Sequence, residues 1–453
     1  MYLYKLYIYF VTGLLVIGQL QLSAQTYMPA EWEKHEGTWL QWPHDNTYGA
    51  GTRDYFESAW IEMTRHLIKG EKVHIIAYDT DEQLHIAEAL DLAGIALDSV
   101  DFFIHPSNDY WVRDNGPIFV YNAEGIVQIT DWGFDGWGND APYALCNEIP
   151  HLIGSDLGAT VLDVNVVVLE GGAVEHDGNG TFFGTVSSIL GDGRNPGLTE
   201  ADIETYLNTY LGFEHFIWLE GALGGSFDIT DSHIDGFLKL HDSQTIVTMN
   251  DADLNYWFVN ASDRDKISNA TNKDGLPYNY VFLPLTDKNV KTEDGANTGS
   301  KGSYVNYYVA NAVVLVPIYN DDNDSIALDI LQTLMPDKEV IGIDCRNMFS
   351  WGGMVHCVTQ QQPAGPLAAT TLPIKTQTNL QIQCFPQPFS STITLRSPEI
   401  IRELFIYDLM GRLVFTQQVG AADISIAPAL APGTYLLEAV TESGIFTSVC
   451  IRN

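Results

Sequence analysis

Cys357 has a setting in this sequence that suits a nucleophile. It follows Trp-Gly-Gly at residues 351–353, where the backbone can come close to a ligand because glycine has no side chain. A thiolate is a strong nucleophile once nearby positive charge lowers the pKa of the thiol. Most single cysteines are instead small buried hydrophobic residues, and this is our interpretation of Cys345. Cys357 is therefore a candidate nucleophile only in combination with other groups.

A second candidate is the segment Thr-Asp-Ser-His-Ile-Asp-Gly at residues 230–236. If this segment is a strand, His233 and Asp235 lie two residues apart and point to the same face. A general acid/base and a carboxylate would then share one wall of a cavity. The alternative is a solvated strand face without a function. No cluster of Cys or His elsewhere matches this Asp-x-His-x-Asp spacing, so we expect no metal site.

Two further carboxylates stand beside turn residues. Asp114 follows Arg113, with Trp111 before the pair and Asn-Gly-Pro after it, and this segment is expected to be a turn with charged groups at its lip. Glu170 ends an apolar strand and precedes Gly-Gly. Either feature alone is common in proteins without a site.

These groups together suit chemistry on a guanidinium. That group is planar, permanently cationic and a poor electrophile, so an enzyme must hold it by bidentate carboxylates, attack its carbon and protonate the leaving ammonia. Asp114 and Asp235 could hold the cation, with Cys357 as nucleophile and His233 as acid. The bound cation would itself help to keep Cys357 as a thiolate.

The elements that must position these residues are of mixed type. Short apolar runs at residues 73–77, 118–120, 165–169 and 312–317 predict strands. Residues 325–334 have helical spacing, and so do residues 199–207, with Thr199 as the N-cap. The fold class is therefore α/β, and we see no sequence repeat that fixes the topology.

Composition divides the chain into four parts. Residues 1–24 predict a signal peptide, with one basic residue, an apolar run and a small-residue cleavage site; the alternative is a membrane anchor. Residues 26–362 predict the α/β catalytic domain. Residues 363–378 are rich in Pro, Thr and Ala and predict a linker. Residues 379–453 show short alternating strands with Gly and Pro turns, which predict a small β-sandwich.

Charge narrows the class of partner. Against 22 Lys and Arg stand 58 Asp and Glu, a formal net charge of −36. So acidic a chain repels nucleic acid and anionic lipid and favours cationic partners. Five cysteines in 453 residues exclude a disulfide scaffold. No later stretch is apolar enough to span a membrane, so the mature protein is expected to have no span.

The sequence resembles the agmatine deiminases and the related bacterial, Porphyromonas-type, peptidylarginine deiminases. The resemblance covers residues 28–362. It includes Trp-Val-Arg-Asp-Asn-Gly-Pro at 111–117, Glu-Gly-Gly at 170–172, Arg-Asn-Pro at 194–196, Ser-Tyr-Val-Asn at 303–306 and His-Cys-Val-Thr-Gln-Gln-Gln-Pro at 356–363. It implies a five-bladed α/β-propeller with the site in its central channel, and hydrolysis of a guanidine to a ureido group and ammonia without metal or cofactor.

The resemblance also implies a role for each candidate residue. Cys357 matches the nucleophile that forms a covalent thiouronium intermediate, and His233 matches the general acid/base. The remaining matches are two guanidinium clamps, a carboxylate that assists them and an aromatic wall beside the substrate: Asp114, Asp235, Glu170 and Trp111.

Within this family the substrate is left open. Residues 131–140 carry acids and no Arg, whereas the peptidylarginine branch uses arginines there to hold a carboxylate. Acids attract the distal amine of agmatine, so we expect agmatine as substrate. The alternatives are peptidylarginine, which would become citrulline, and a non-catalytic surface protein that binds cationic amines.

The last 75 residues resemble the C-terminal sorting domain of the Bacteroidota type IX secretion system. The motifs are Phe-Pro-Gln-Pro-Phe-Ser at 385–390 and Ala-Pro-Gly-Thr-Tyr-Leu at 431–436. With the signal peptide, this implies transfer through the type IX machinery to the cell surface or the medium. A disulfide between Cys384 and Cys450 is a further hypothesis.

Overall fold

The structure is a computed structural model that describes residues 26–191, 193–222, 228–367, 383–407, 413–441 and 445–453. The chain divides into two compact units, with the boundary between residues 369 and 370. The predicted signal peptide and residues 368–378 of the predicted linker lie outside the described residues. Within the described ranges, the helices are too short or too polar to cross a membrane.

The larger unit contains five separate sheets in its described residues. In four of them, the first strand is antiparallel to the second and the second is parallel to the third. These are β4 (Ile118–Tyr121), β5 (Val127–Gly133) and β6 (Val161–Val168); β7 (Glu175–His176), β8 (Thr181–Thr185) and β9 (His215–Leu219); β10 (Leu238–Asp242), β11 (Thr245–Thr248) and β12 (Asn279–Phe282); and β13 (Tyr308–Val309), β14 (Val313–Ile318) and β15 (Glu339–Asp344).

The fifth sheet joins the two ends of this unit. Strand β16 (Gln360–Pro363) pairs antiparallel with β1 (His35–Gln41), and β1 is followed by the parallel strands β2 (Lys72–Ala77) and β3 (Val100–Ile104). The residues after Cys357 therefore lie beside the first strand of the chain, although more than 300 residues separate them in sequence.

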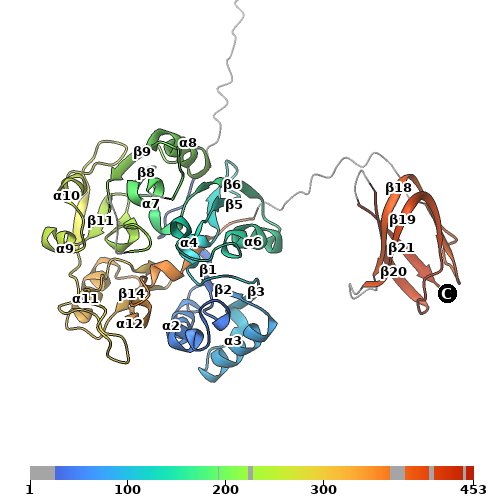
Figure 1. Ribbon diagram of the computed structural model, residues 1–453, viewed down its shortest axis with the longest axis horizontal. Coiled ribbons are helices and arrows are strands. Elements are labelled where there is room, and N and C mark those ends of the chain that lie inside the picture. The colour runs from blue at the N-terminus through green and yellow to red at the C-terminus, as the bar shows by residue number, and fades with distance from the viewer. Residues whose placement is uncertain (1–25, 192, 223–227, 368–382, 408–412, 442–444) are drawn as a thin grey trace, which may run out of the picture. The chain divides into compact units, whose positions relative to one another are not determined.

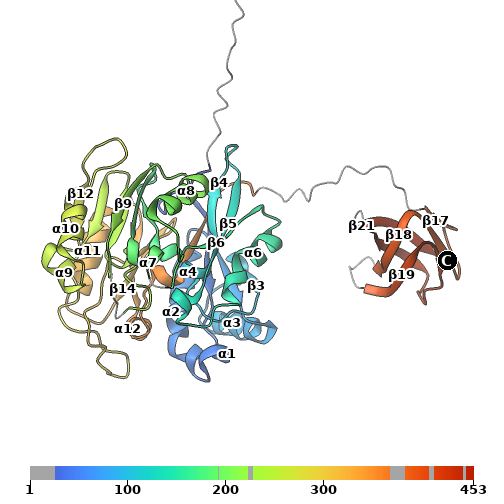
Figure 2. The same ribbon diagram turned by 45° about the horizontal axis from the view of Figure 1, so that its top comes forward.

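Helices connect the parallel strands, as a parallel pair requires. The longer ones are α2 (Thr52–Leu67), α3 (Thr80–Leu92), α6 (Ile149–Leu157), α8 (Glu200–Leu211), α9 (Asp251–Tyr256), α10 (Ala261–Ser268) and α11 (Asp324–Leu334). The short ones are α1 (Asp45–Tyr48), α5 (Gly136–Asn139), α7 (Val186–Leu190), η1 (Leu97–Ser99) and η2 (Cys146–Glu148). Helix α12 (Arg346–Phe349) instead follows β15 and leads toward β16. In Figures 1 and 2 the longer connecting helices α3, α6, α8 and α10 lie toward the outside of this unit.

Helix α8 shows how local sequence sets an element. Thr199 accepts a hydrogen bond from the backbone N–H of Asp202, and the Asp202 carboxylate accepts one from the backbone of Thr199. This capping box satisfies two donors that the first turn leaves without partners. Gly212 ends the helix with φ 80°, which glycine adopts without steric cost. The helix begins where the sequence predicts and extends to Leu211, beyond the predicted end at residue 207.

Four one-turn helices stand immediately before the first strands of four sheets. They are α4 (Val112–Asn115) before β4, η3 (Gly171–Ala173) before β7, η4 (Ile234–Gly236) before β10 and η5 (His356–Val358) before β16. Helix α4 contacts η3 and η5, and η3 contacts η4. In Figure 1, α4 lies near the middle of the unit. Segments far apart in the sequence thus meet at one place.

The predicted strands and helices of this unit are confirmed. They correspond to β2, β4, β6, β14, α8 and α11, with boundaries that differ by a few residues. The main core cluster fills the space between the sheets and helices with large side chains such as Trp42, Trp60 and Tyr307. Cys345 is fully buried in that cluster, which agrees with its interpretation as a packing residue.

The smaller unit differs from the predicted sandwich. Its strands are β17 (Gln383–Phe385), β18 (Ile393–Tyr407), β19 (Leu413–Ile426), β20 (Gly433–Val440) and β21 (Ile445–Arg452). Hydrogen bonds join these described strands into one antiparallel sheet, not two. The two strands predicted at 392–396 and 403–407 form the single strand β18, because register shifts carry the chain across the gap between them.

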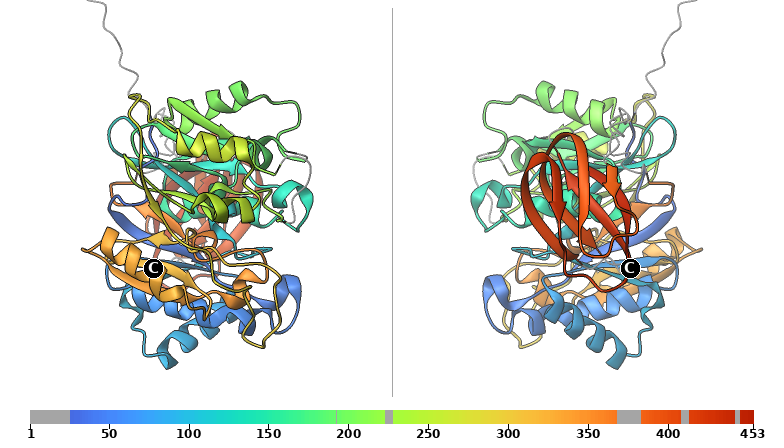
Figure 3. Two further views of the ribbon diagram at one scale, coloured as in Figure 1. Left: turned by 90° about the vertical axis from the view of Figure 1, so that its left-hand side faces the viewer. Right: turned by 90° about the vertical axis from the view of Figure 1, so that its right-hand side faces the viewer.

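The sheet of this unit nearly closes on itself. One end of β18 pairs with β17 and the other with β20, while β19 follows its opposite edge, and Phe389 bridges to Arg452 of β21. Figure 3 shows these strands side by side. Cys450 is buried as a thiol, so the disulfide with Cys384 is not formed in this structure.

Candidate active site

Cys357 lies in η5 at the middle of the larger unit and is partly buried. Its Sγ is 3.5 Å from Nδ2 of Asn306 and 4.0 Å from Oδ2 of Asp235. The same Asn306 amide nitrogen donates to the backbone carbonyl of Asp235 at 3.3 Å. Asn306 therefore ties the sulfur to the segment that carries Asp235.

The surroundings of the Cys357 thiol are acidic. Burial raises the pKa of this thiol well above its usual value, and the Asp235 and Asp114 carboxylates raise it further. A cation bound between these carboxylates would oppose that effect, because positive charge stabilises a thiolate. The site is therefore arranged so that a bound cation favours the thiolate.

His233 lies between two carboxylates. Its Nε2 is 2.6 Å from Glu170 Oε2, and its Nδ1 is 3.6 Å from Asp114 Oδ1. Burial acts to lower the pKa of the imidazole, but Asp114 and Glu170 outweigh burial and raise that pKa to about 9. His233 is therefore a cation at neutral pH. Its Nδ1 faces Asp114 beyond hydrogen-bond length, so its proton is not held by a strong bond.

Asp114 is held by two donors. Its Oδ1 accepts from the backbone N–H of Gly172 at 3.1 Å, and its Oδ2 accepts from the indole N–H of Trp137 at 3.0 Å. Burial raises the pKa of this carboxyl to about 6, and the charges of Glu170 and Asp235 contribute to the increase. Asp114 is thus ionised at neutral pH with a small margin.

Arg194 supports Glu170 from behind. Its Nε lies 2.8 Å from Glu170 Oε1, its Nη2 lies 3.3 Å from Glu170 Oε2, and both side chains are fully buried. Its Nη1 donates to Asp231 at the edge of the site. The fork of donors fixes both Glu170 oxygens, as a planar guanidinium can. The Arg194 guanidinium is therefore already paired with two carboxylates, those of Glu170 and Asp231.

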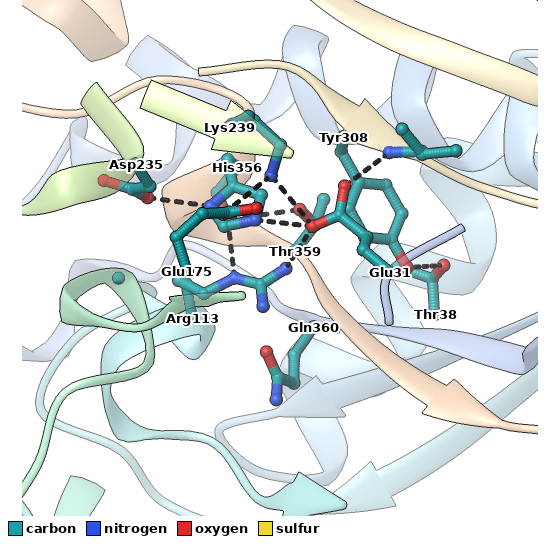
Figure 4. A network of polar contacts seen from close by, with 12 residues as sticks. Glu31, Thr38, Arg113, Glu175, Asp235, Lys239, Tyr308, His356, Thr359 and Gln360 are labelled. Atoms are coloured by element: carbon teal, nitrogen blue, oxygen red, sulfur yellow. Dashed lines mark hydrogen bonds and ion pairs between the residues drawn. The ribbon is translucent and has the colours of Figure 1, made fainter. Parts of the chain in front are cut away.

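Asp235 belongs to a second chain of buried charges (Figure 4). Its Oδ2 is 2.7 Å from Nδ1 of His356, and Nε2 of His356 is 2.7 Å from Oε2 of Glu31. That Glu31 oxygen also accepts from Nζ of Lys239 at 3.0 Å. Burial would raise the pKa of Asp235, but the bond from His356 and its charge lower it below its usual value.

Two glycines provide the close approaches that the site needs. A Cβ at Gly172 would stand 2.5 Å from His233 Nδ1 and 2.7 Å from Asp114 Oδ1. A Cβ at Gly353 would stand 2.2 Å from Trp111 Cζ3. Gly172 is the last residue of the Glu-Gly-Gly segment at 170–172. Any larger residue there would collide with His233 and Asp114, so this position needs glycine. The close approach at Gly353 places the buried Trp111 ring against the segment that leads to Cys357.

The structure brings the predicted residues together but corrects two local expectations. Residues 230–236 are not a strand: Asp231 and Ser232 have φ 56° and 69°, and η4 follows. The hydrogen bond from Arg194 to Asp231 holds this turn. In the turn, His233 lies against Glu170 and Asp114, whereas Asp235 lies against His356. The Arg113–Asp114 pair lies in a buried helical turn, not at an exposed lip.

The residues that support the site were not identified as functional from the sequence. They are Asn306, Arg194, His356, Trp137, Lys239 and Glu31. Asn306, Arg194 and His356 stand in segments that carry the resemblance, without an assigned role. Lys239 had a weak signal, because it interrupts the apolar run Phe-Leu-Lys-Leu at 237–240. Glu31 also lies within the residues that carry the resemblance, again without an assigned role, because a single carboxylate in a sequence looks like any surface acid.

Chemically, the site combines a thiol with carboxylates on two sides of it and an imidazolium. Carboxylates in this number suit a cation with several N–H donors, and a planar guanidinium offers such donors in a fixed fork. The thiol supplies a nucleophile, and His233 supplies a proton near the leaving group.

Comparison with known proteins gives the same chemistry by an independent route. Residues 27–363 match the model of the Porphyromonas-type peptidyl-arginine deiminases. An agmatine deiminase of Pseudomonas aeruginosa is 32% identical over 361 residues, which cover 74% of this chain and 95% of that protein. Residues 383–451 match the secretion system C-terminal sorting domain, which indicates export to the cell surface or secretion.

Solved structures agree with this assignment. The agmatine deiminase of Enterococcus faecalis aligns with a TM-score of 0.66 and 26% identity, over 75% of this chain and 96% of that one. A substrate-bound agmatine deiminase of C. jejuni, at 24% identity and a TM-score of 0.65, covers 76% of this chain and 97% of its own and shows a shared fold. From its sequence match and its site, the chain belongs to the Porphyromonas-type peptidyl-arginine deiminase family.

Proposed function

We propose that this chain is an exported guanidine deiminase that hydrolyses agmatine to N-carbamoylputrescine and ammonia. The observation that carries the proposal is the meeting of Cys357 with Asp235, Asp114 and His233 at one place. Cys357 Sγ lies 4.0 Å from one clamp carboxylate, and the other clamp faces the imidazolium. The matches to agmatine deiminases support this assignment.

The first half of the reaction forms a covalent intermediate. Asp114 and Asp235 bind the N–H groups of the guanidinium. The positive charge of the bound guanidinium lowers the pKa of the Cys357 thiol, which releases its proton to solvent. The thiolate then forms a C–S bond to the guanidinium carbon. His233 gives its proton to an amino group, the C–N bond breaks, and ammonia leaves from an S-linked thiouronium.

The second half of the reaction hydrolyses the intermediate and regenerates the free enzyme. His233, now neutral, accepts a proton from water, and the oxygen of that water bonds to the thiouronium carbon. The remaining proton of the added hydroxyl goes to solvent as the C–S bond breaks, which releases the ureido product and the Cys357 thiolate. The thiolate regains a proton from solvent when the product leaves. One water is consumed and one nitrogen leaves as ammonia, so the overall change is hydrolysis. Glu170 keeps His233 oriented in both halves through the bond of 2.6 Å.

Agmatine is favoured over arginine by the charges near the site. Arg194 is the cation beside Glu170, and it is already bonded to Glu170 and Asp231. It is therefore poorly placed to bind the carboxylate of an arginine. Asp231 and Asp135 are partly exposed carboxylates that interact with Glu170 and Arg194. Such charges attract the second cation of agmatine and repel a carboxylate.

The finer description of the fold belongs to the same proposal. We infer that the five sheets are the blades of a propeller with the site in its channel. The support is that four site-bearing helical turns directly precede first strands and contact one another. Trp111, packed against Gly353, is inferred to form the aromatic wall beside the substrate.

A substrate panel tests the proposed activity. Purified protein that lacks residues 1–24 is incubated with agmatine, arginine, and peptides with C-terminal or internal arginine, and ureido product and ammonia are measured. We expect product from agmatine and none from the Cys357→Ala variant. Citrulline on peptides, with agmatine untouched, would instead identify a peptidylarginine deiminase. Binding of agmatine without product would identify a non-catalytic binding protein.

A further inference from the structure

Glu31 is a largely buried residue, with 11% of its side chain exposed, that the proposed reaction does not use, and the partners of its carboxylate come from distant parts of the chain. Its Oε1 accepts from the backbone N–H of Val309 at 2.8 Å. Its Oε2 accepts from His356 at 2.7 Å and from Lys239 at 3.0 Å, with Arg113 Nη2 at 3.8 Å. Four separate segments therefore converge on one side chain (Figure 4).

The segment that carries Glu31 is fixed on both sides. Tyr27 exchanges two backbone hydrogen bonds of 2.9 Å with Tyr121 of β4, and the Met28 N–H donates to the Leu211 carbonyl at the end of α8. On the C-terminal side, the backbone carbonyl oxygen of Glu31 lies 2.8 Å from Nε2 of His35. The first described residues of the chain thus hold one carboxylate at the middle of the unit.

The chain of contacts leads directly to the substrate clamp. His356 precedes Cys357 and bonds through its two ring nitrogens to Glu31 and Asp235, each at 2.7 Å. An imidazole in such a bridge cannot rotate without losing a charge-assisted bond. Its proton on Nδ1 can only be donated to Asp235, and that bond fixes one carboxylate oxygen.

The charges around this bridge favour an ionised Glu31. Burial would raise the pKa of Glu31, but Lys239, His356 and Arg113 lower it well below its usual value. Glu175 carries a charge of the same sign as Glu31 and also lies near Lys239, at 3.7 Å. Burial raises the pKa of the Glu175 carboxyl, and the charge of Glu31 raises it further. Around Asp235, the remaining charged or titratable groups are His233, Lys239, Asp114 and Cys357.

We propose that Glu31 is a positioning residue which, through the imidazole of His356, keeps the Asp235 carboxylate anionic and oriented toward the substrate guanidinium. The inference rests on the proposed function for the identity of the bound cation. Without the Glu31 charge, His356 is a weaker partner for Asp235. Burial then favours the neutral carboxyl, which binds a cation poorly.

A binding experiment separates this role from simple packing. In a Cys357→Ser background, agmatine affinity is measured by calorimetry between pH 6 and pH 8.5 for the parent and for Glu31→Gln. We expect Glu31→Gln to bind about tenfold more weakly at pH 7, because a hydrogen bond to a charged group is weakened. We also expect its affinity to recover as pH rises, because Asp235 then ionises.

Glu57→Gln is the matched control. Glu57 accepts hydrogen bonds from Trp42 and from a histidine, His85, as Glu31 does from His356, but among the described residues none of its hydrogen bonds leads to Cys357, His233 or the clamp carboxylates. We expect it to bind as the parent does. His356→Asn replaces Glu31→Gln if thermal melting shows that the latter is unfolded, and it carries the same expectation.

Two results would overturn the inference. One is unchanged affinity in the Glu31 and His356 variants, and the other is a loss of affinity that is equal at every pH, as a packing defect would give. A parent protein that binds agmatine while wild type releases no ammonia would overturn the proposed function alone. No binding by the parent would overturn both.

Discussion

Two chains of buried charges meet at Cys357, and they have the same residue types in the same order. One runs from Asp114 through His233 to Glu170 and its cation, Arg194. The other runs from Asp235 through His356 to Glu31 and its cations, which include Lys239. In each chain an aspartate faces the site, and a histidine joins it to a glutamate that a cation supports.

The two chains differ at the bond between histidine and aspartate. His233 Nδ1 is 3.6 Å from Asp114, whereas His356 Nδ1 is 2.7 Å from Asp235. The longer separation leaves the proton of His233 available to a leaving group, and the shorter one commits the proton of His356 to a carboxylate. The electrostatics agree, since the pKa of Asp114 is raised to about 6 and that of Asp235 is lowered.

The difference shows that residue type does not settle the role of a histidine. Both imidazoles are buried and both contact a glutamate. A free second nitrogen makes a proton carrier, and a bonded second nitrogen makes a positioning group.

The largest expected effect separates the two histidines. His233→Asn should lower kcat by about 10³-fold, because general acid/base catalysis is lost. His356→Asn should mainly raise KM, because the clamp is misplaced or neutral while the proton carrier remains. Steady-state kinetics on agmatine for both variants test this. Equal losses of kcat in the two variants would contradict the distinction.

A smaller effect is expected from Gly172→Ala. The new methyl group would stand within 2.7 Å of both His233 and Asp114, so one of them must shift. A displacement near 1 Å at a catalytic group costs about 100-fold in rate. Gly275→Ala is the matched control for kinetics, because a Cβ there meets no atom within 4 Å, although its φ of 76° strains the loop. Wild-type kcat in Gly172→Ala would show that the close approach is not needed.

The pH profile should reflect the first chain. Asp114, with a pKa of about 6, must be ionised to bind the cation, so kcat/KM should fall as pH drops below that value. His233, with a pKa of about 9, must be protonated to release ammonia, so kcat/KM should fall as pH rises above it. Beyond each limit the decline is about tenfold per pH unit. Because the groups are coupled, these limits belong to the site as a whole.

The smallest expected effect is a loss of stability alone, and it serves as a reference for the kinetic effects of the site variants. Thr199→Ala removes the capping box of α8 and should cost about 1 kcal/mol of stability. Helix α8 also contacts the segment that carries Glu31, but at its other end, where the Leu211 carbonyl accepts from Met28. We expect a lower melting temperature with unchanged kcat and KM. A raised KM would mean that general loosening imitates the loss of Glu31.

Much of the site was predictable because it stands in short segments with unusual residue types. Cys357 after Gly-Gly, Glu170 before Gly-Gly and Asp114 before Gly-Pro are visible in the sequence, because close approaches require glycine and sharp turns favour it. The helix beginning after Thr199 and the buried strands were predictable from capping and apolar runs. These signals depend on neighbours within about ten residues.

Other features were missed or misread because they depend on distant partners. The segment at 230–236 alternates like a strand, yet Arg194, far away in the sequence, holds Asp231 in a turn. The two predicted strands at 392–396 and 403–407 join because β19 and β20 pair along a continuous β18. A local pattern cannot report a partner that is not local.

The amino-acid sequence alone specified the reacting groups: a thiol, an imidazole and carboxylates at turns of an acidic, two-part chain. Tertiary structure decided which carboxylate each imidazole faces and at what distance. It also decided that Glu31, near the beginning of the chain, lies against His356 near the end of the larger unit. The physical reason is that proton affinity and orientation depend on burial and on charges within a few ångströms, and sequence separation does not encode these distances.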